Sequence, residues 1–137
     1  MKERLAIDGG MPVRRALLPY GRQALTDADI AAVVDVLRSD WITTGPTVER
    51  FEAAFAARVG AAHAVTFSSG TAALHGAAFA AGLQPGDEAI TSPLTFCATS
   101  NAVLYQGAVP VFADVRDDRL TIDVTAVEAR LTPKTRA

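Results

Sequence analysis

Short apolar segments alternate with helical ones between residues 62 and 115, and this alternation is the feature that most limits the fold. Three of these segments are rich in Ala, Val and Ile and have the length of strands, at residues 62–67, 88–92 and 108–115. Helical patterns at 71–81 and 95–106 separate them. Strands that alternate with helices in this way form mostly parallel sheets with right-handed crossovers. The pattern therefore predicts an α/β fold with a mostly parallel sheet and flanking helices.

The sequence before this alternation predicts an arm and two helices. Residues 1–25 hold turn formers without sustained periodicity, so we expect an irregular arm, followed by one domain over residues 26–137. Thr26 and Asp29 have the spacing of a capping box, which indicates that a helix begins there. A second helix is expected to begin at Pro46 and to end at Gly60.

The sequence after the third apolar segment predicts one more short helix. This helix lies within residues 121–131, with Asp123 as its N-cap, and "TPKTRA" follows it. A helix after the third strand of such a sheet normally leads to a fourth strand, which would begin where this sequence stops. We therefore expect an incomplete fold that is the N-terminal part of something larger.

Composition excludes several classes of function. Half of the 137 residues are apolar and the net charge is −2, so neither nucleic acid nor an anionic membrane is an expected partner. No apolar run has the length of a membrane span, and no signal peptide is visible. Cys97 is the single cysteine, which excludes an internal disulfide and favours the reducing cytoplasm.

The stretch "FSSGTAALHGAAFAAGL" places small polar residues where the first strand passes into a helix. Backbone N–H groups at a helix N-terminus have no partner within the helix and can bind a phosphate. Gly70 would let a ligand approach the backbone, while Ser69 and Thr71 can donate hydroxyl hydrogen bonds. The alternative is an N-cap with nothing bound, and the stretch alone does not choose between the two. It is neither a Walker A loop nor a G-x-G-x-x-G motif.

The stretch "SPLTFCATSN" repeats this design after the second strand, with Thr95 as a candidate N-cap. Ligands in open α/β sheets lie at the carboxyl ends of the strands, so Phe96 could cover a flat ring beside a bound phosphate. The alternative for Phe96 is a place in the core. We expect the neighbouring Cys97 to be a small buried packing residue, and the alternative is a low-pKa thiol at a helix N-terminus.

"TTGP", "SSGTAALH" and "PLTFCAT", in this order, resemble the DegT/DnrJ/EryC1/StrS sugar aminotransferases, which are fold-type I enzymes that use pyridoxal 5'-phosphate (PLP). The resemblance implies that residues 26–137 are the N-terminal part of the PLP-binding large domain. It is nearest to transaminases that aminate C4 of a nucleotide-linked 4-keto-6-deoxy amino sugar. It also implies glutamate as the amino donor and a homodimer.

The resemblance implies roles for individual residues as well. Ser69, Gly70 and Thr71 fall in the part of the motif that holds the cofactor phosphate, and Phe96 matches the aromatic residue stacked on the pyridine ring. The residues that match the substrate side are Tyr20, Asp40, Trp41, Ile42 and Thr43. The alternative for residues 40–43 is a helix end with Trp41 packed on the core.

No catalytic residue is assigned. PLP chemistry needs a lysine and an acidic partner for the ring nitrogen, but neither Lys2 nor Lys134 matches the family's motif. Asp114 ends a strand and is expected to be a turn former. The two histidines, His63 and His75, have no metal-ligand spacing, so we expect no metal. A non-catalytic remnant and an unrelated phosphate-binding α/β domain remain as alternatives.

Overall fold

The computed structural model describes residues 4–137, so Lys2 and the first residues of the predicted arm lie outside the described part. The chain divides into two compact units, one up to Thr47 and one from Val48 to Ala137. The division into an arm over 1–25 and a domain over 26–137 stays a prediction.

Within residues 4–45, the first unit forms two helical elements. A 3-10 helix, η1, spans Ala6–Asp8, and helix α1 spans Asp27–Leu37. The predicted capping box is confirmed: Thr26 Oγ1 accepts from the Asp29 N–H at 3.3 Å, and Asp29 Oδ2 accepts from the Thr26 N–H at 2.8 Å. This reciprocal pair satisfies two backbone N–H groups that the helix itself cannot.

Helix α2 begins and ends where the sequence predicts. It spans Pro46–Val59, and Gly60 follows it with φ +70°, the left-handed conformation common just after a helix. The turn before α2 brings backbone close to Trp41, because a Cβ on Gly45 would lie 2.7 Å from Trp41 Cβ. The Trp41 side chain is 61% exposed, so it is not packed in a core within its unit.

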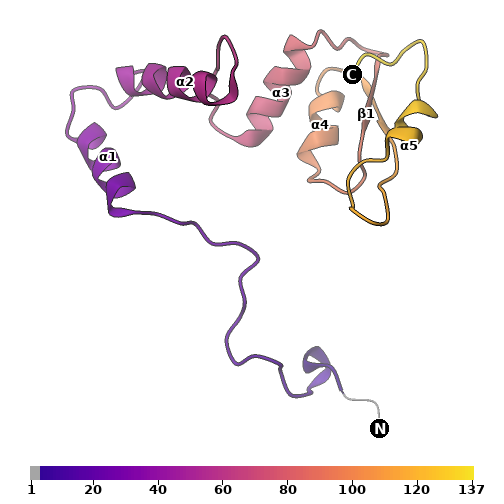
Figure 1. Ribbon diagram of the computed structural model, residues 1–137, viewed down its shortest axis with the longest axis horizontal. Helices are drawn as coiled ribbons and strands as arrows, with labels where there is room; N and C mark the ends of the chain where they lie inside the picture. Colours follow the sequence, from indigo (N-terminus) through magenta and orange to yellow (C-terminus); the bar gives the residue numbers. More distant parts are fainter. Residues whose placement is uncertain (1–3) are drawn as a thin grey trace. The chain divides into compact units, whose positions relative to one another are not determined.

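The second unit is built on a parallel sheet, which confirms the α/β class (Figure 1). Strand β1 spans Glu88–Thr91, strand β2 spans Val109–Phe112, and Glu88 pairs with Val109. Helix α3 spans Gly70–Ala80, and helix α4 spans Ala98–Leu104 between the two strands. Helix α4 packs on both strands and on α3. The buried core between them is small and consists of Leu83, Ala89, Val103 and Ala108.

The last residues of the chain extend the sheet on the other edge of β1. The Glu88 N–H donates to the Lys134 carbonyl at 2.9 Å, and the Ile90 N–H donates to the Ala137 carbonyl at 2.8 Å. A parallel bridge joins Glu88 and Thr135. Sheet pairing therefore begins at the place where a fourth strand is expected. Helix α5, Val124–Glu128, precedes it and carries the predicted Asp123 cap, whose carboxylate accepts from the Thr125 N–H at 3.0 Å.

The strand predicted at 62–67 is wrong. Among the described residues the sheet has two strands, β1 and β2, and this segment lies outside it. An apolar run can form a strand only where a partner's backbone groups complete the ladder, and sequence pattern does not supply that partner. Val65 is accordingly 72% exposed.

The predicted start of the helix over residues 95–106 is also wrong, because α4 begins at Ala98 and Thr95 is not its N-cap. A turn comes first, in which Ser92 Oγ accepts from the Leu94 N–H at 3.1 Å. The hydroxyl of Thr95 instead lies 3.0 Å from that of Thr99. Cys97 occupies the N-cap position without a side-chain hydrogen bond and is exposed, which corrects the expectation that it is buried.

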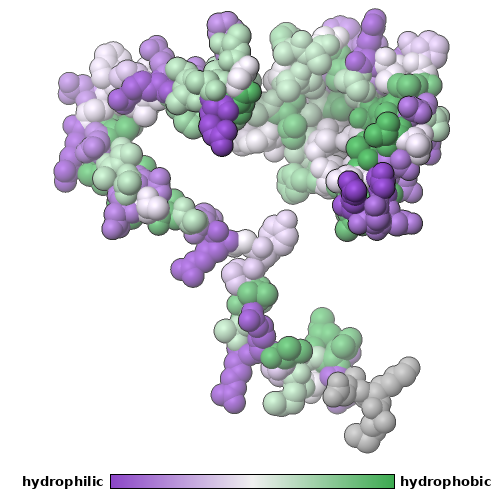
Figure 2. Space-filling model, in the orientation of Figure 1, coloured by the Kyte–Doolittle hydropathy of each residue, from purple (hydrophilic) through white to green (hydrophobic). Residues whose placement is uncertain are grey.

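Large apolar side chains lie at the surface of the described chain, as the green regions of Figure 2 show. In the second unit they include Phe51, Phe55, Phe79, Leu104 and Val109. Most of the buried apolar residues are alanines, which bring elements close together but bury little area each. None of the helices within residues 4–137 has the length and apolarity that crossing a membrane requires.

Candidate functional site

At the start of α3, some backbone N–H groups are hydrogen-bonded to Ser69 and others have no partner in the described chain. Ser69 is the N-cap: its Oγ accepts from the Ala72 N–H at 3.1 Å, and its carbonyl accepts from the Ala73 N–H at 3.0 Å. The N–H groups of Gly70 and Thr71 have no partner among the described residues. The turn at residues 68–71 therefore presents two free N–H donors at the positive end of the helix dipole.

Gly70 leaves open space beside these donors. A Cβ built on Gly70 would meet no atom within 4 Å, and the residue has no positive φ. The backbone of the turn therefore does not require glycine, and the fold has room for a side chain there. Because glycine has no side chain, a ligand can approach the backbone of the turn closely at Gly70.

Phe96 lies at the same pocket as the 68–71 turn, although the two are far apart in sequence. The pocket has a volume of about 680 Å³, and it is lined by Gly70, Thr71, Ala73, Leu74, Ala77, Phe96 and Ala98. We call it the Phe96 pocket. The Phe96 side chain is 74% exposed, which corrects the alternative that it is a core residue. The pocket thus combines an aromatic face and small apolar residues with polar groups at one end.

A second pocket also borders the turn. It has a volume of about 430 Å³, and its lining includes Phe51, Phe55, Thr66, Phe67, Ser69 and Gly70. We call it the Phe51 pocket. Ser69 faces this pocket rather than the Phe96 pocket, and its hydroxyl oxygen is occupied as the cap. The structure therefore brings Gly70, Thr71 and Phe96 together and places Ser69 beside them in a supporting position.

Glu52 makes a contact with Thr66 that the sequence did not predict. Its Oε1 accepts two hydrogen bonds from Thr66, one from the N–H at 2.7 Å and one from the hydroxyl at 2.8 Å. These bonds, the backbone one first, hold the pKa of the Glu52 carboxyl below its usual value. A glutamate on a helix is ordinarily a solvated residue, and the contact spans 14 residues, so no local signal pointed to it.

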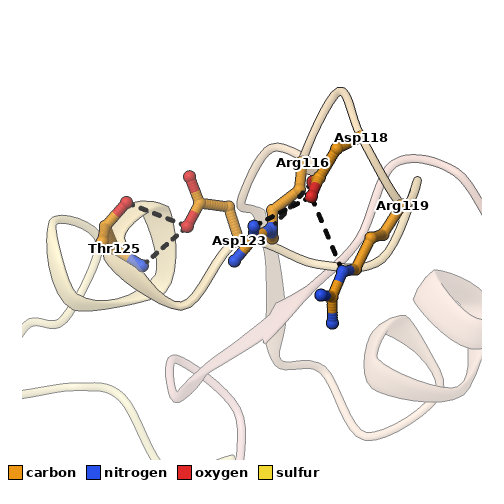
Figure 3. A network of polar contacts seen from close by, with 5 residues as sticks. All are labelled: Arg116, Asp118, Arg119, Asp123 and Thr125. Atoms are coloured by element: carbon orange, nitrogen blue, oxygen red, sulfur yellow. Dashed lines mark hydrogen bonds and ion pairs between the residues drawn. The ribbon is translucent and has the colours of Figure 1, made fainter.

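Among the described residues, no lysine or arginine lines the Phe96 pocket, and residues 59–115 contain neither. The ion pairs that the structure records lie elsewhere, mainly in the loop after β2 (Figure 3). There Asp118 Oδ1 lies 3.0 Å from Arg116 Nε, and this contact lowers the pKa of Asp118. An anion at the 68–71 turn would therefore depend on N–H groups, hydroxyls and the helix dipole.

The remaining candidates have structural roles or stay predictions. The His75 ring packs against Tyr105 with the ring centroids 5.1 Å apart, and Asp114 Oδ1 accepts from the Val115 N–H at 2.8 Å. Among residues 4–137, no three His, Cys, Asp or Glu side chains are grouped as a metal site would require. The predicted substrate-side residues are exposed and all belong to the first unit: Tyr20, Asp40, Trp41, Ile42 and Thr43.

Comparison with known proteins gives consistent matches. Residues 23–137 match the DegT/DnrJ/EryC1/StrS aminotransferase family. The spore coat polysaccharide biosynthesis protein SpsC of Bacillus subtilis (strain 168) is 48% identical over 124 residues, which are 90% of this chain and 32% of SpsC. The chain thus spans about a third of the length of that relative.

Solved structures agree with this match. The PLP form of the putative sugar aminotransferase Spr1654 from Streptococcus pneumoniae superposes with a TM-score of 0.80 at 35% identity, covering 86% of this chain and 30% of that one. The 3-amino-5-hydroxybenzoic acid synthase has a TM-score of 0.76 at 38% identity, covering 82% of this chain and 30% of that one.

Proposed function

The chain belongs to the DegT/DnrJ/EryC1/StrS aminotransferase family, and from this premise we propose that it holds the phosphate and one ring face of PLP in a sugar aminotransferase. The α/β fold predicted from the sequence, an incomplete part of a fold-type I PLP-dependent transferase, is confirmed by the aminotransferases that superpose on it. Membership of the family overturns the alternative of an unrelated phosphate-binding domain.

The 68–71 turn fits a phosphate. The N–H groups of Gly70 and Thr71 are free of protein partners within the described chain, and the open space at Gly70 admits a ligand to them. The Thr71 hydroxyl is available as a further donor at the edge of the Phe96 pocket. Together these groups offer the kind of anion site that a helix N-terminus provides.

The Phe96 pocket fits an aromatic ring. Phe96 exposes most of its side chain, and the small side chains of Ala73 and Ala77 on α3 line the same pocket. An aromatic side chain packs well on a flat heterocycle, and small apolar neighbours exclude water from that contact. PLP would supply the electron sink for moving an amino group. The chain's own residues would hold the phosphate and cover the ring, and we assign no proton-transfer group to them.

The names of the relatives support a proposal for the substrate. SpsC is named for polysaccharide biosynthesis and Spr1654 as a putative sugar aminotransferase, which supports a sugar substrate. We propose a nucleotide-linked 4-keto-6-deoxy sugar, glutamate as the amino donor, a homodimer and a cytoplasmic location. The proposed substrate-side residues are Tyr20, Asp40, Trp41, Ile42 and Thr43.

The observation that carries this proposal is the pair of free N–H groups at Gly70 and Thr71 beside Phe96. The test is a titration of PLP affinity in the intact protein, with thermal stability measured in parallel. Thr71→Ala should weaken PLP binding about ten- to a hundredfold, as expected for a hydrogen bond to a charged group. Its melting temperature should stay unchanged, because Thr71 does not cap α3.

Thr121→Ala is the matched control. Thr121 is exposed in the loop before α5 and does not line the Phe96 pocket. It should leave PLP affinity unchanged. A Thr71→Ala variant that loses stability but binds PLP normally would overturn the proposal and leave the turn a structural feature.

A further inference from the structure

We propose that Glu52 is a positioning residue for the anion-binding 68–71 turn, acting through Thr66. This inference rests on the proposed function, because it assumes that the turn holds the cofactor phosphate. Glu52 lies on α2 and does not line the Phe96 pocket, so it would not touch the cofactor. Its effect would come from fixing the segment that leads into the turn.

Two hydrogen bonds on one oxygen fix Thr66 strongly. Glu52 Oε1 accepts from both the N–H and the hydroxyl of Thr66, at 2.7 Å and 2.8 Å. The first bond fixes the backbone and the second fixes the side-chain rotamer. Hydrogen bonds to an ionised carboxylate are stronger than neutral ones, and the two bonds from Thr66 lower the pKa of Glu52.

The next residue is fixed to a different helix. A Cβ on Gly76 of α3 would clash with Phe67 Cζ, so the Phe67 ring lies directly on the α3 backbone at this glycine. Thr66 is therefore held to α2 and Phe67 to α3 at consecutive positions. These side-chain contacts take the place of the sheet pairing that the segment lacks within the described residues.

Little chain separates these contacts from the turn. Three residues lead from Thr66 to Ser69, which is about 10 Å of extended chain at most. Thr66, Phe67, Ser69 and Gly70 also line the Phe51 pocket together with Phe51 and Phe55 of α2. Without the bonds from Thr66 to Glu52, the segment that leads into the turn would be more mobile. The free N–H groups of Gly70 and Thr71 would then be held less precisely in the orientation that binds a phosphate.

The experiment compares PLP with pyridoxal, which lacks the phosphate, by equilibrium dialysis against the intact protein. Glu52→Ala should weaken PLP binding about five- to tenfold, less than the loss of a direct phosphate contact. Pyridoxal affinity should change less than about twofold, since pyridoxal does not use the turn. A general loss of folded protein would instead weaken both ligands equally.

Three further variants sharpen the test. Glu52→Gln keeps an oxygen at the position that accepts both bonds, so it should restore most of the PLP affinity. Adding Thr66→Val to Glu52→Ala should cause no further loss, because both changes break one interaction. Glu49→Ala removes a carboxylate from the same helix one turn earlier and should have no effect.

The results for Glu52→Ala and Thr71→Ala distinguish the role of Glu52 from the proposed phosphate site. Equal losses for PLP and pyridoxal in Glu52→Ala, or unchanged PLP affinity there while Thr71→Ala binds PLP weakly, would overturn the role of Glu52 alone. Normal PLP affinity in Glu52→Ala and Thr71→Ala together would overturn both.

Discussion

The hydroxyl oxygen of Ser69 accepts a hydrogen bond from the Ala72 N–H at 3.1 Å, which confirms that Ser69 caps α3. A cap and a phosphate site were alternatives on sequence grounds. The structure shows that they need not compete, because the cap uses the Ala72 N–H and leaves those of Gly70 and Thr71 free within the described residues. One turn can thus stabilise its helix and still present donors to a ligand.

Ser69→Ala should lower stability more than ligand affinity. Removal of the cap leaves the Ala72 N–H without its partner, and we expect a loss of about 1 kcal/mol in the free energy of unfolding. Urea denaturation of the intact protein measures this loss. Ser68→Ala is the control, since Ser68 does not accept from an α3 N–H. Equal stability of the Ser69→Ala and Ser68→Ala variants would contradict the capping role.

Gly70→Ala should have the opposite effect. The residue has no positive φ and its Cβ would meet no atom, so alanine should stabilise the fold by about 0.4 to 1 kcal/mol or leave it unchanged. We expect the added methyl group to restrict the approach of a ligand to the backbone of the turn and to weaken PLP binding by about tenfold or more. Urea denaturation and a PLP titration check the two parts. A stable variant that binds PLP as tightly as the wild type would show that the phosphate lies elsewhere.

The capping box of α1 should give a stability term that depends on pH. Hydrogen bonds from the Thr26 backbone and hydroxyl hold the pKa of Asp29 below its ordinary value. Because the folded-state pKa is the lower one, the stabilisation is complete above the unfolded pKa of about 3.9 and is lost as pH falls through the folded pKa. The difference in unfolding free energy between wild type and Asp29→Asn should therefore be constant near neutral pH and shrink below about pH 4.

Asp35→Asn is the control for this measurement, since it removes the same charge from α1 outside the capping box. Urea denaturation over a pH series gives both differences. A difference for Asp29→Asn that persists unchanged down to about pH 2.5 would contradict the capping box as its source.

Local signals in the sequence predicted local structure well. The capping box at Thr26, the helix start at Pro46, the Gly60 stop and the Asp123 cap are all present. Each of these features depends on residues within one helical turn, so the local sequence is enough to predict it. Gly70 and Phe96 do meet at one pocket, but the expectation was based on a strand at 62–67 that the described sheet lacks.

Contacts between distant parts of the chain could not be predicted in the same way. The segment 62–67 has the composition of a strand, but its role depends on a backbone partner that composition cannot reveal. The bonds from Thr66 to Glu52 depend on how α2 lies against that segment. Thr95 is not the cap: Ser92 Oγ accepts from the Leu94 N–H, the Thr95 hydroxyl lies against that of Thr99, and the helix begins at Ala98.

The most direct test of the account is the effect of Phe96→Ala on two ligands of the intact protein. Phe96 is largely exposed, so its truncation should change stability little. Stacking touches only the ring, and its loss should weaken PLP binding about two- to tenfold. The affinity for inorganic phosphate, measured by its competition with PLP, should stay the same. Unchanged PLP affinity, or an equal loss for both ligands, would contradict the claim that the Phe96 pocket holds the cofactor ring beside a phosphate at Gly70 and Thr71.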